Sequence, residues 1–530
     1  MTVVAPRQNP TLALIDELLA DQARLQTPAA QFATAHANGS ASQLSTLSSQ
    51  LIPLTAPRPG EQYAFEVDLD ACTGCKACVS ACHSLNGLDD GETWRDTGLL
   101  ASSDVRHPFT QTITTACHHC ADAACLNGCP VLAYEKDPLT GIVRHLDDQC
   151  IGCSYCVLMC PYDVPKYNEA RGIVRKCDMC HGRLSEGEAP ACVQACPTHA
   201  IRIVNVTTHV DGALRVDTSA FLAAAPDPAI TLPTTRYVSK RAIPENVLAA
   251  DAAVLQPQPP HWPLVAMLML LPMAVGCGIA DKILSLPTPA LAVSCWLAGA
   301  TGLALSVLHL GQPRRAWRVF LGLRKSWLSR EAIVFGTWFP LASLYTAIRL
   351  DWIPLAPGPL RSTLAAGTAA LGTLGLFCSV MIYADTRRAF WRFANTAPRF
   401  FGSAILLGLA SALAAPGAPR VLGFVLTVAT IAKLLLEARA LDPLNGDRDT
   451  LTPELKTARL LTGPLRSTNE LRVIAAGFGG VVLPLLIATG PAPGWLAWVA
   501  LPCMLLGELA ERYLFFRAVA APKMPGVNHT

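Results

Sequence analysis

CTGCKACVSAC at residues 72–82 and CIGCSYCVLMCP at residues 150–161 share one cysteine spacing, C-x2-C-x2-C-x3-C. Two further groups of four cysteines occur in the same region, and three of the four groups lead directly into a proline. Three thiolates on one tight loop can hold three irons of a cubane, while the fourth points toward a second cluster. We therefore expect four [4Fe–4S] clusters in two pairs. The groups are Cys72, Cys75, Cys78 and Cys82; Cys117, Cys120, Cys125 and Cys129; Cys150, Cys153, Cys156 and Cys160; and Cys177, Cys180, Cys192 and Cys196.

Two other uses of cysteine compete with this interpretation. Zinc ribbons use C-x2-C pairs with four ligands per site, and they do not need a repeated triple-plus-one spacing. Disulfides form in oxidising compartments, whereas the N-terminal MTVVAPRQNP has neither a twin arginine nor an apolar signal core. Iron–sulfur chemistry is the favoured hypothesis, and a non-redox membrane scaffold with zinc-bound cysteines is the alternative from another class.

The composition separates the chain into two halves. It is 51% hydrophobic and 15% charged, and it holds 20 cysteines at a formal net charge of +3. That small charge argues against a general nucleic-acid binder. Long uncharged runs begin only after Trp262, beyond all sixteen grouped cysteines. We expect a soluble, cysteine-dense half followed by a membrane half.

The predicted boundaries follow shifts in composition along the chain. Residues 11–25 have apolar residues at helical spacing, which predicts an amphipathic helix that packs on the neighbouring domain or docks a partner. An Ala-, Ser-, Thr- and Pro-rich tether follows this helix. The predicted parts are an N-terminal extension at 1–60, a ferredoxin-type domain at 61–232, a linker at 233–260, a transmembrane domain at 261–520 and a tail at 521–530.

Eight apolar segments occur in the second half, and most approach the ~20 residues that cross a bilayer as a helix. The predicted fold class is an α+β ferredoxin-like domain with short strands, for example at 63–67 and 142–144, followed by an all-α eight-helix transmembrane domain. The expected spans are residues 263–280, 290–308, 332–348, 362–384, 400–415, 421–436, 473–490 and 495–516.

The cysteine region, residues 61–232, resembles the four-cluster ferredoxin subunits of the dimethyl sulfoxide reductase family of molybdenum and tungsten enzymes. One departure is His83, which stands where proline usually follows the fourth cysteine. The resemblance implies that outer groups pair with each other and inner groups with each other. The implied ligand sets are Cys72, Cys75, Cys78 and Cys196; Cys177, Cys180, Cys192 and Cys82; Cys117, Cys120, Cys125 and Cys160; and Cys150, Cys153, Cys156 and Cys129.

The membrane half resembles the quinol-oxidising anchor subunit of the same enzymes, in the segments HLGQPRRAWRVF (309–320), SWLSREA (326–332) and GELAERYLFF (507–516). The chain thus looks like a natural fusion of the two subunits. The resemblance implies menaquinol or ubiquinol as substrate, and a separate catalytic partner that holds a molybdopterin cofactor.

Two ionisable residues are the candidates for a quinol site, because quinol oxidation releases protons as well as electrons. His309 ends the second expected span and Glu331 begins the third. Each could instead only cap a helix or extend to the interface. Lys433, Glu437, Glu508 and Glu511 are weaker candidates, and the first two have the i,i+4 spacing of a simple pair. Haem b is not expected, because only His309 lies at a span and each haem needs two histidines.

Positive charge predicts the orientation of the domain in the membrane. Nineteen lysines and arginines fall in loops on the cysteine-rich side and four in the opposite loops. This bias places the iron–sulfur domain in the cytoplasm and the spans in the cell inner membrane, although some of these arginines could dock the ferredoxin domain. We expect an electron-transfer subunit that oxidises quinol and supplies a catalytic partner. The alternative is reversed flow, from a molybdo-dehydrogenase to quinone.

Overall fold

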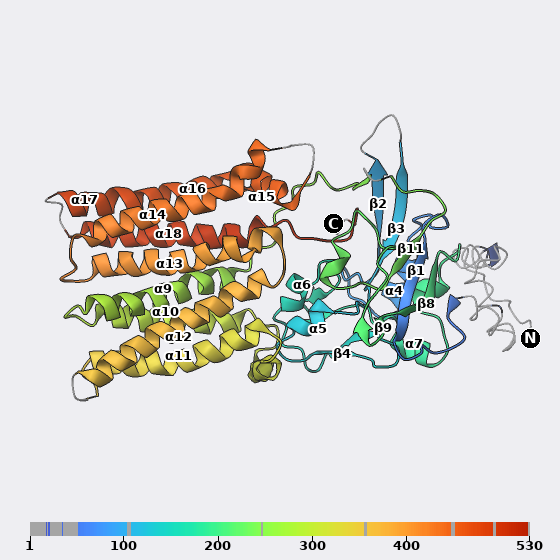
Figure 1. Cartoon of the computed structure of the whole chain (residues 1–530), viewed down its shortest axis with the longest axis horizontal. Helices are drawn as coiled ribbons and strands as arrows, with labels where there is room; N and C mark the ends of the chain where they lie inside the picture. The colour runs from blue at the N-terminus through green and yellow to red at the C-terminus, as the bar shows by residue number, and fades with distance from the viewer. Residues whose placement is uncertain are drawn as a thin grey trace, which may run out of the picture.

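The computed structural model describes residues 51–527 except 103–107, 245–246, 354–357, 447–450 and 491–493, together with residues 17, 20, 21 and 34. A helical bundle and a smaller cysteine-rich domain lie end to end along the molecule (Figure 1). The amphipathic helix predicted at 11–25 lies outside the described residues, except that Glu17, Ala20 and Asp21 are helical.

Two three-stranded sheets frame the cysteine-rich domain. In the first, β1 (Glu61–Asp68) pairs antiparallel with β8 (Ile201–Thr207) and parallel with β11 (Arg236–Val238). In the second, β2 (Asp96–Ser102) lies between β3 (Thr110–Thr115) and β12 (Val247–Ala249). The apolar side chains of β1 are buried beside the cysteine loops, which is the burial expected of a strand in a small core. The strand predicted at 63–67 is confirmed within β1.

Short hairpins and short helices alternate with the cysteine loops. The hairpins are β4 (Tyr134–Lys136) with β5 (Val143–His145), β6 (Lys166–Asn168) with β7 (Ile173–Arg175), and β9 (His209–Val210) with β10 (Ala213–Leu214). The strand predicted at 142–144 overlaps β5. The helices are α4 (Ala77–Leu85), α5 (Ala124–Gly128), α6 (Tyr155–Met159), α7 (His181–Ser185) and α8 (Ala191–Gln194).

Residues 233–260, predicted as a linker, contain two short strands that pair with the cysteine-rich domain. They supply β11 to the first sheet and β12 to the second. The C-terminal tail also returns to this domain, where Met524 and Val527 are buried in its core and Lys523 forms an ion pair with Asp251. Both segments therefore help to hold the cysteine-rich domain against the bundle.

In the described part of the second half there are ten α-helices, some of them joined by 3-10 or π turns. They are α9 (Trp262–Leu284), α10 (Ala290–Leu308), α11 (Trp327–Arg349), α12 (Pro359–Ala384), α13 (Phe393–Ala414), α14 (Leu422–Ala438), α15 (Pro453–Thr462), α16 (Arg466–Gly477), α17 (Leu483–Thr489) and α18 (Leu496–Arg517). A π-helical turn, η5 (Phe478–Val482), joins α16 and α17 into one rod. The chain is a multi-pass membrane protein.

Within the described residues, six of these rods are long and apolar enough to cross a membrane: α9, α10, α11, α12, α13 and the α16–α17 rod. The expected count of eight is not confirmed. Helix α14 has 17 residues, and α18 carries Glu508, Glu511 and Arg512 in its second half. Both nevertheless lie in the bundle, where α14 contacts α13 and α18 contacts α16 (Figure 1).

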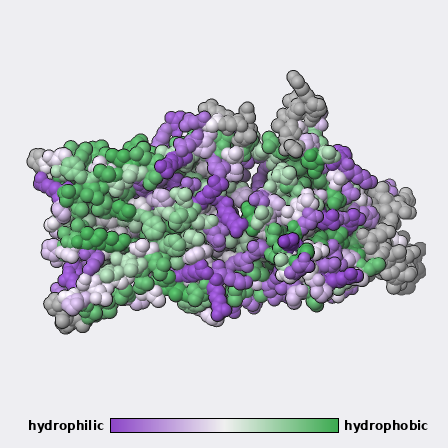
Figure 2. Space-filling view, viewed as in Figure 1, coloured by the Kyte–Doolittle hydropathy of each residue, from purple (hydrophilic) through white to green (hydrophobic). Residues whose placement is uncertain are grey.

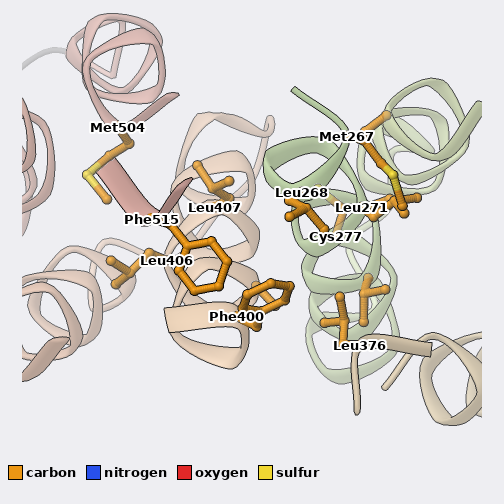
Figure 3. Packing of buried hydrophobic residues seen from close by; sticks show 14 of the residues in the cluster. Met267, Leu268, Leu271, Cys277, Leu376, Phe400, Leu406, Leu407, Met504 and Phe515 are labelled. Atoms are coloured by element: carbon orange, nitrogen blue, oxygen red, sulfur yellow. The ribbon is translucent and has the colours of Figure 1, made fainter. Parts of the chain in front are cut away.

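Helix α9 lies at the centre of the bundle and contacts α10, α12, α13 and α18. Figure 3 shows Leu268 and Leu271 of α9 in the same core region as Phe400 of α13 and Phe515 of α18. Gly276 lies against the backbone of α13 at Gly408, where a Cβ on either residue would collide. Small residues at such crossings let membrane helices approach closely.

The two halves meet through direct backbone and side-chain contacts. The 3-10 segment η2 (Pro313–Gly322), between α10 and α11, lies along the cysteine-rich domain. Here Ser326 donates a 2.7 Å hydrogen bond to the carbonyl of Gly128, and Arg315 donates to the carbonyl of Cys150 at 3.1 Å. Figure 2 shows apolar side chains over the bundle and polar ones gathered near this junction. The contacts hold two cysteine loops, those ending at Cys129 and beginning at Cys150, directly on the anchor.

Candidate functional site

The cysteine loops depend on backbone conformations that few residues adopt. Gly74 and Gly152 precede the second cysteine of their groups at φ of 70° and 69°, and Lys76 and Ser154 follow it at 62° and 56°. Two left-handed residues flanking one cysteine turn the loop tightly, so that three thiols face the same space. The third cysteine then begins a helix in both groups, at Cys78 in α4 and at Cys156 in α6. The repeated sequence motif is thus a repeated backbone shape.

Two of the expected cysteine sets each line a cavity of their own. Cys72, Cys75 and Cys78 share one cavity with Cys196, which arrives from the far end of the domain. Cys117, Cys120 and Cys125 share another with Cys160. In each cavity the fourth thiol comes from a different group than the other three, as the resemblance implied.

In each of the other two sets, the cysteines lie close to one another. Burial, together with the nearby thiolates of Cys192 and Cys180, raises the pKa of Cys82 to about 12. Burial raises the pKa of Cys153, and the nearby charges of Cys129 and Cys150 raise it further. The fold therefore brings Cys82 to the fourth group and Cys129 to the third.

The thiols receive hydrogen bonds from the backbone. The amides of Gly152, Ala133 and Ala200 donate to the sulfurs of Cys150, Cys129 and Cys196 at 3.3, 3.2 and 3.2 Å. Such donors stabilise thiolates and tune the potential of the clusters they bind. In the described part of the chain, no three His, Cys, Asp or Glu side chains converge on a single metal ion. Instead, four thiols line each of the two cavities described above, an arrangement that fits a cluster of several irons.

Two buried cations accompany the cysteines. Arg95 is 2% exposed. Burial opposes its charge, but the thiolates of Cys192 and Cys78 contribute to a pKa above its usual value. Lys176, equally buried, lies within electrostatic range of Cys117 and Cys177 and donates to the carbonyl of Cys177 at 2.7 Å. Arg95 thus lies between the first and fourth groups, and Lys176 between the second and fourth.

One cysteine set touches the membrane domain. Tyr155, between Cys153 and Cys156, is buried in the core of the bundle and donates a 2.9 Å hydrogen bond to the carbonyl of Ile382 in α12. Arg388, just after α12, donates to the carbonyl of Leu158 at 3.2 Å. The first set, by contrast, includes the exposed Cys75. The cysteine sets therefore run from the membrane surface to the surface of the soluble domain.

Glu331 lies at the same junction, on the first turns of α11. Its carboxylate is buried and accepts a hydrogen bond from Ser379 of α12. Tyr383 and Tyr155 both lie within electrostatic range of it. A carboxylate in this position lies between the apolar bundle and the cysteine loop, with a hydroxyl donor fixed beside it.

His309 follows the last residue of α10, and its Nδ1 is buried without a hydrogen-bond partner among the described residues. The next residue, Leu310, packs on the apolar cluster that contains Cys129, Cys150 and Cys156. His309 and Glu331 are joined by no hydrogen bond or ion pair in the part of the chain that the structure describes. Both lie at the junction with the cysteine-rich domain.

The weaker candidates form a separate group in the bundle. Lys433 pairs with Glu437 at 3.4 Å, which confirms the suggested i,i+4 pair. It also pairs with Glu508 of α18 at 2.5 Å, while Glu511 pairs with Arg399 of α13 at 2.6 Å. These residues are thus engaged with one another.

Comparison with known proteins covers both halves. A family model described as 4Fe-4S dicluster domain matches residues 109–206, and one described as DMSO reductase anchor subunit (DmsC) matches residues 288–517. The B subunit of the anaerobic dimethyl sulfoxide reductase of Escherichia coli (strain K12) is 40% identical over 148 residues, which cover 26% of this sequence and 72% of the relative. The protein belongs to the dimethyl sulfoxide reductase family.

Within this family the chain is a fusion of the iron–sulfur subunit and the membrane anchor. The corresponding B subunit of Haemophilus influenzae is 35% identical over 182 residues, 33% of this sequence and 87% of the relative. The thiosulfate reductase electron transfer subunit PhsB of Salmonella typhi is 38% identical over 144 residues, which cover 27% of this sequence and 74% of the relative. The chain is therefore an iron–sulfur electron-transfer subunit with its anchor attached.

Several residues at the site were not predicted from the sequence. Tyr155 and Lys176 stand directly before grouped cysteines, and Arg95 stands alone in a polar stretch. Adjacency to a cysteine was the only available signal, and it does not distinguish a buried side chain from an exposed one. Only the tertiary contacts assign these residues to the cluster region and the membrane junction.

Proposed function

We propose that this chain oxidises menaquinol or ubiquinol in the membrane and passes the electrons to a separate catalytic subunit that holds a molybdopterin cofactor. When bound, four [4Fe–4S] clusters would carry single electrons along the cysteine-rich domain. The ligand sets are those that the family resemblance implied, with Cys150, Cys153, Cys156 and Cys129 nearest the membrane. The contact of that set with the anchor through Tyr155 carries the proposal.

Glu331 is the proposed acceptor of a quinol proton. It is buried at the junction, and Ser379 orients its carboxylate. The backbone of α11 fixes its position, and Tyr155 places the cysteine loop within range of it. A carboxylate held close to the electron acceptor can take the proton as the electron leaves. His309 is the second proposed contact for the quinol, because its buried Nδ1 has no partner among the described residues.

We also propose that the iron–sulfur domain faces the cytoplasm. The loops after α10 and α12 and the C-terminal tail lie on the side of that domain, and they carry much of the positive charge counted in the sequence. Arg315, Arg318 and Arg388 donate to backbone carbonyls of the domain. Docking explains these three arginines, so the proposed orientation depends on the rest of the positive charge on this side.

The test is a redox titration of the purified complex, followed by low-temperature EPR with iron, sulfide and molybdenum analysis. We expect about sixteen irons per chain, a molybdenum-containing partner, and clusters that a menaquinol analogue reduces. Clusters that no quinol reduces would remove the role of the anchor. Zinc in place of iron would overturn the whole proposal.

The same architecture could run in reverse, from a dehydrogenase partner to quinone. The direction depends on cluster potentials, which follow from hydrogen bonds and burial around each cluster. Potentials below that of the quinone couple throughout the chain would favour this reversed flow. A rise in potential from the membrane set toward the exposed set would favour quinol oxidation.

A further inference from the structure

A cavity of about 380 Å³ opens in the bundle between α13, α14, α15 and α16. Its apolar wall includes Ile431, Leu435 and Val473, all of them exposed on the outer surface of the bundle. Its polar wall is formed by Arg399, Glu437, Arg472 and Asn469. Neither Glu331 nor His309 lines this cavity. Its shape, polar at one end and open to the lipid along an apolar side, fits an amphiphile.

The polar wall belongs to a buried network of ion pairs. Arg472 pairs with Glu437 at 3.2 Å, and Lys433 bridges Glu437 and Glu508. Arg399 and Arg512 both pair with Glu511, at 2.6 and 3.0 Å. Every member is at most 8% exposed.

The network has more cations than anions. Among the described residues it contains four cationic side chains and three carboxylates. Among the described residues, the buried Nε of Arg472 at the cavity has no hydrogen-bond partner, and neither has Glu437 Oε1, which is 3.4 Å from the ammonium group of Lys433. An uncompensated charge in an apolar region is costly, so an anionic ligand at this position would stabilise the network.

The depth of the cavity matches the headgroup region of a membrane. Arg472 lies six residues from the start of α16 and Arg399 six residues from the start of α13, so each is about 9 Å into its helix. Helix α15, whose Leu461 lines the cavity, lies at the end of the bundle that faces the iron–sulfur domain (Figure 1). Basic pockets between membrane helices at this level hold anionic lipid headgroups.

We propose that this cavity is a binding site for an anionic phospholipid. The phosphate faces Arg472, and an acyl chain lies along Ile431, Leu435 and Val473. A neutral quinone would leave the excess positive charge uncompensated, so charge favours the lipid. The proposal is independent of the quinol site, because the cavity and Glu331 share no lining residue.

The test is native mass spectrometry of the purified cluster-loaded chain after exchange into nanodiscs of phosphatidylcholine with graded phosphatidylglycerol. We expect the chain to retain phosphatidylglycerol preferentially. Arg472→Gln should weaken that retention by about fivefold or more, because one arginine contact is lost. The matched control is Arg466→Gln, on the same helix but exposed and paired with Glu470, which should leave retention unchanged.

A second pair of variants tests the cavity while leaving every charged side chain in place. Val473→Trp should block it, whereas Ile474→Trp places the same ring on the lipid-facing surface outside the cavity. Loss of retained phosphatidylglycerol in the first variant only would support the proposal. Equal retention of phosphatidylcholine and phosphatidylglycerol, retention unaffected by Arg472→Gln and Val473→Trp, or displacement of the lipid by stoichiometric menaquinone would overturn it.

Discussion

The two halves of this chain bury charge in different ways. In the cysteine-rich half, Arg95 and Lys176 are buried beside thiols, and the nearby anions are sulfurs. In the bundle, Lys433 and Arg399 are buried beside carboxylates of other helices. The first arrangement supplies positive charge to clusters that carry electrons. In the second arrangement the charges pair with one another, and some of them line the cavity at the edge of the network.

The difference also appears in how each site is assembled. The loops of the first and third groups each take three thiols from seven consecutive residues, shaped by left-handed residues such as Gly74 and Gly152. The bundle site joins Lys433 to Glu508, 75 residues away, and Arg399 to Glu511, 112 residues away. The three local thiols of a set tolerate small shifts of the surrounding fold, whereas its fourth thiol and the bundle network depend on packing between distant segments.

The largest expected effect separates the two ends of the cysteine-rich half. We expect Cys153→Ser, in the set that touches the anchor, to abolish quinol-driven reduction of the remaining clusters, because the entry point is lost. Cys75→Ser, at the exposed end, should leave the other three clusters reducible by quinol. The measurement is EPR of each variant after addition of a menaquinol analogue. Equal loss in both variants would contradict the proposed order of the sets.

A smaller effect is expected at the junction itself. Glu331→Gln removes the proposed proton acceptor while keeping the shape of the side chain, and should lower the rate of quinol oxidation about a hundredfold. Ser379→Ala, which removes only the donor that orients Glu331, should cost much less. Stopped-flow reduction by quinol measures both rates, with dithionite reduction of the clusters as the control. An unchanged rate in Glu331→Gln would place the quinol elsewhere.

The bundle network should respond in stability. Lys433→Met leaves Glu508 and Glu437 buried without their common cation, and we expect it to lower the free energy of unfolding by about 3–5 kcal/mol. Arg466→Gln breaks an exposed pair with Glu470 and should change stability too little to detect. Thermal unfolding of the purified chain in one detergent compares the two. Similar midpoints for both variants would mean that the network contributes little.

The smallest effect is expected where the halves meet. Gly311 lies against the backbone of Gly172, so that a Cβ at Gly311 would collide with its carbonyl. Gly311→Ala should therefore cost about 1–3 kcal/mol and loosen the docking of the two halves. Gly336→Ala, in α11 with open space around its Cα, is the control and should be neutral or slightly stabilising. Limited proteolysis at the junction reports the loosening, and equal protection in both variants would contradict it.

Much of the cysteine-rich half could be predicted from its sequence. The spacing of Cys72 to Cys82 and of Cys150 to Cys160 is a local pattern, and local backbone geometry turns it into a loop that faces one space. The strand at 63–67 follows from the same kind of short-range signal. The role of residues 233–260 could not be predicted, because β11 and β12 gain their partners from strands more than 130 residues earlier.

The membrane half was predictable in outline and less so in detail. Apolar length predicted the six helices that can cross a membrane, because hydrophobicity adds up residue by residue. Apolar length alone did not separate these six helices from α14 and α18, whose charged side chains form ion pairs inside the bundle. Isolated in a sequence, Glu508 and Arg512 count against a span. In the bundle, Glu508 pairs with Lys433 and Arg512 pairs with Glu511.

The sequence by itself determined which cysteines share a loop, which segments are apolar, and the family to which the chain is related. These properties depend on neighbours along the chain. Only the tertiary structure decided that Tyr155 joins one cysteine set to the anchor, and that Arg472 and Glu437 face a cavity open to lipid. Both depend on contacts between distant segments, where packing determines which partners meet.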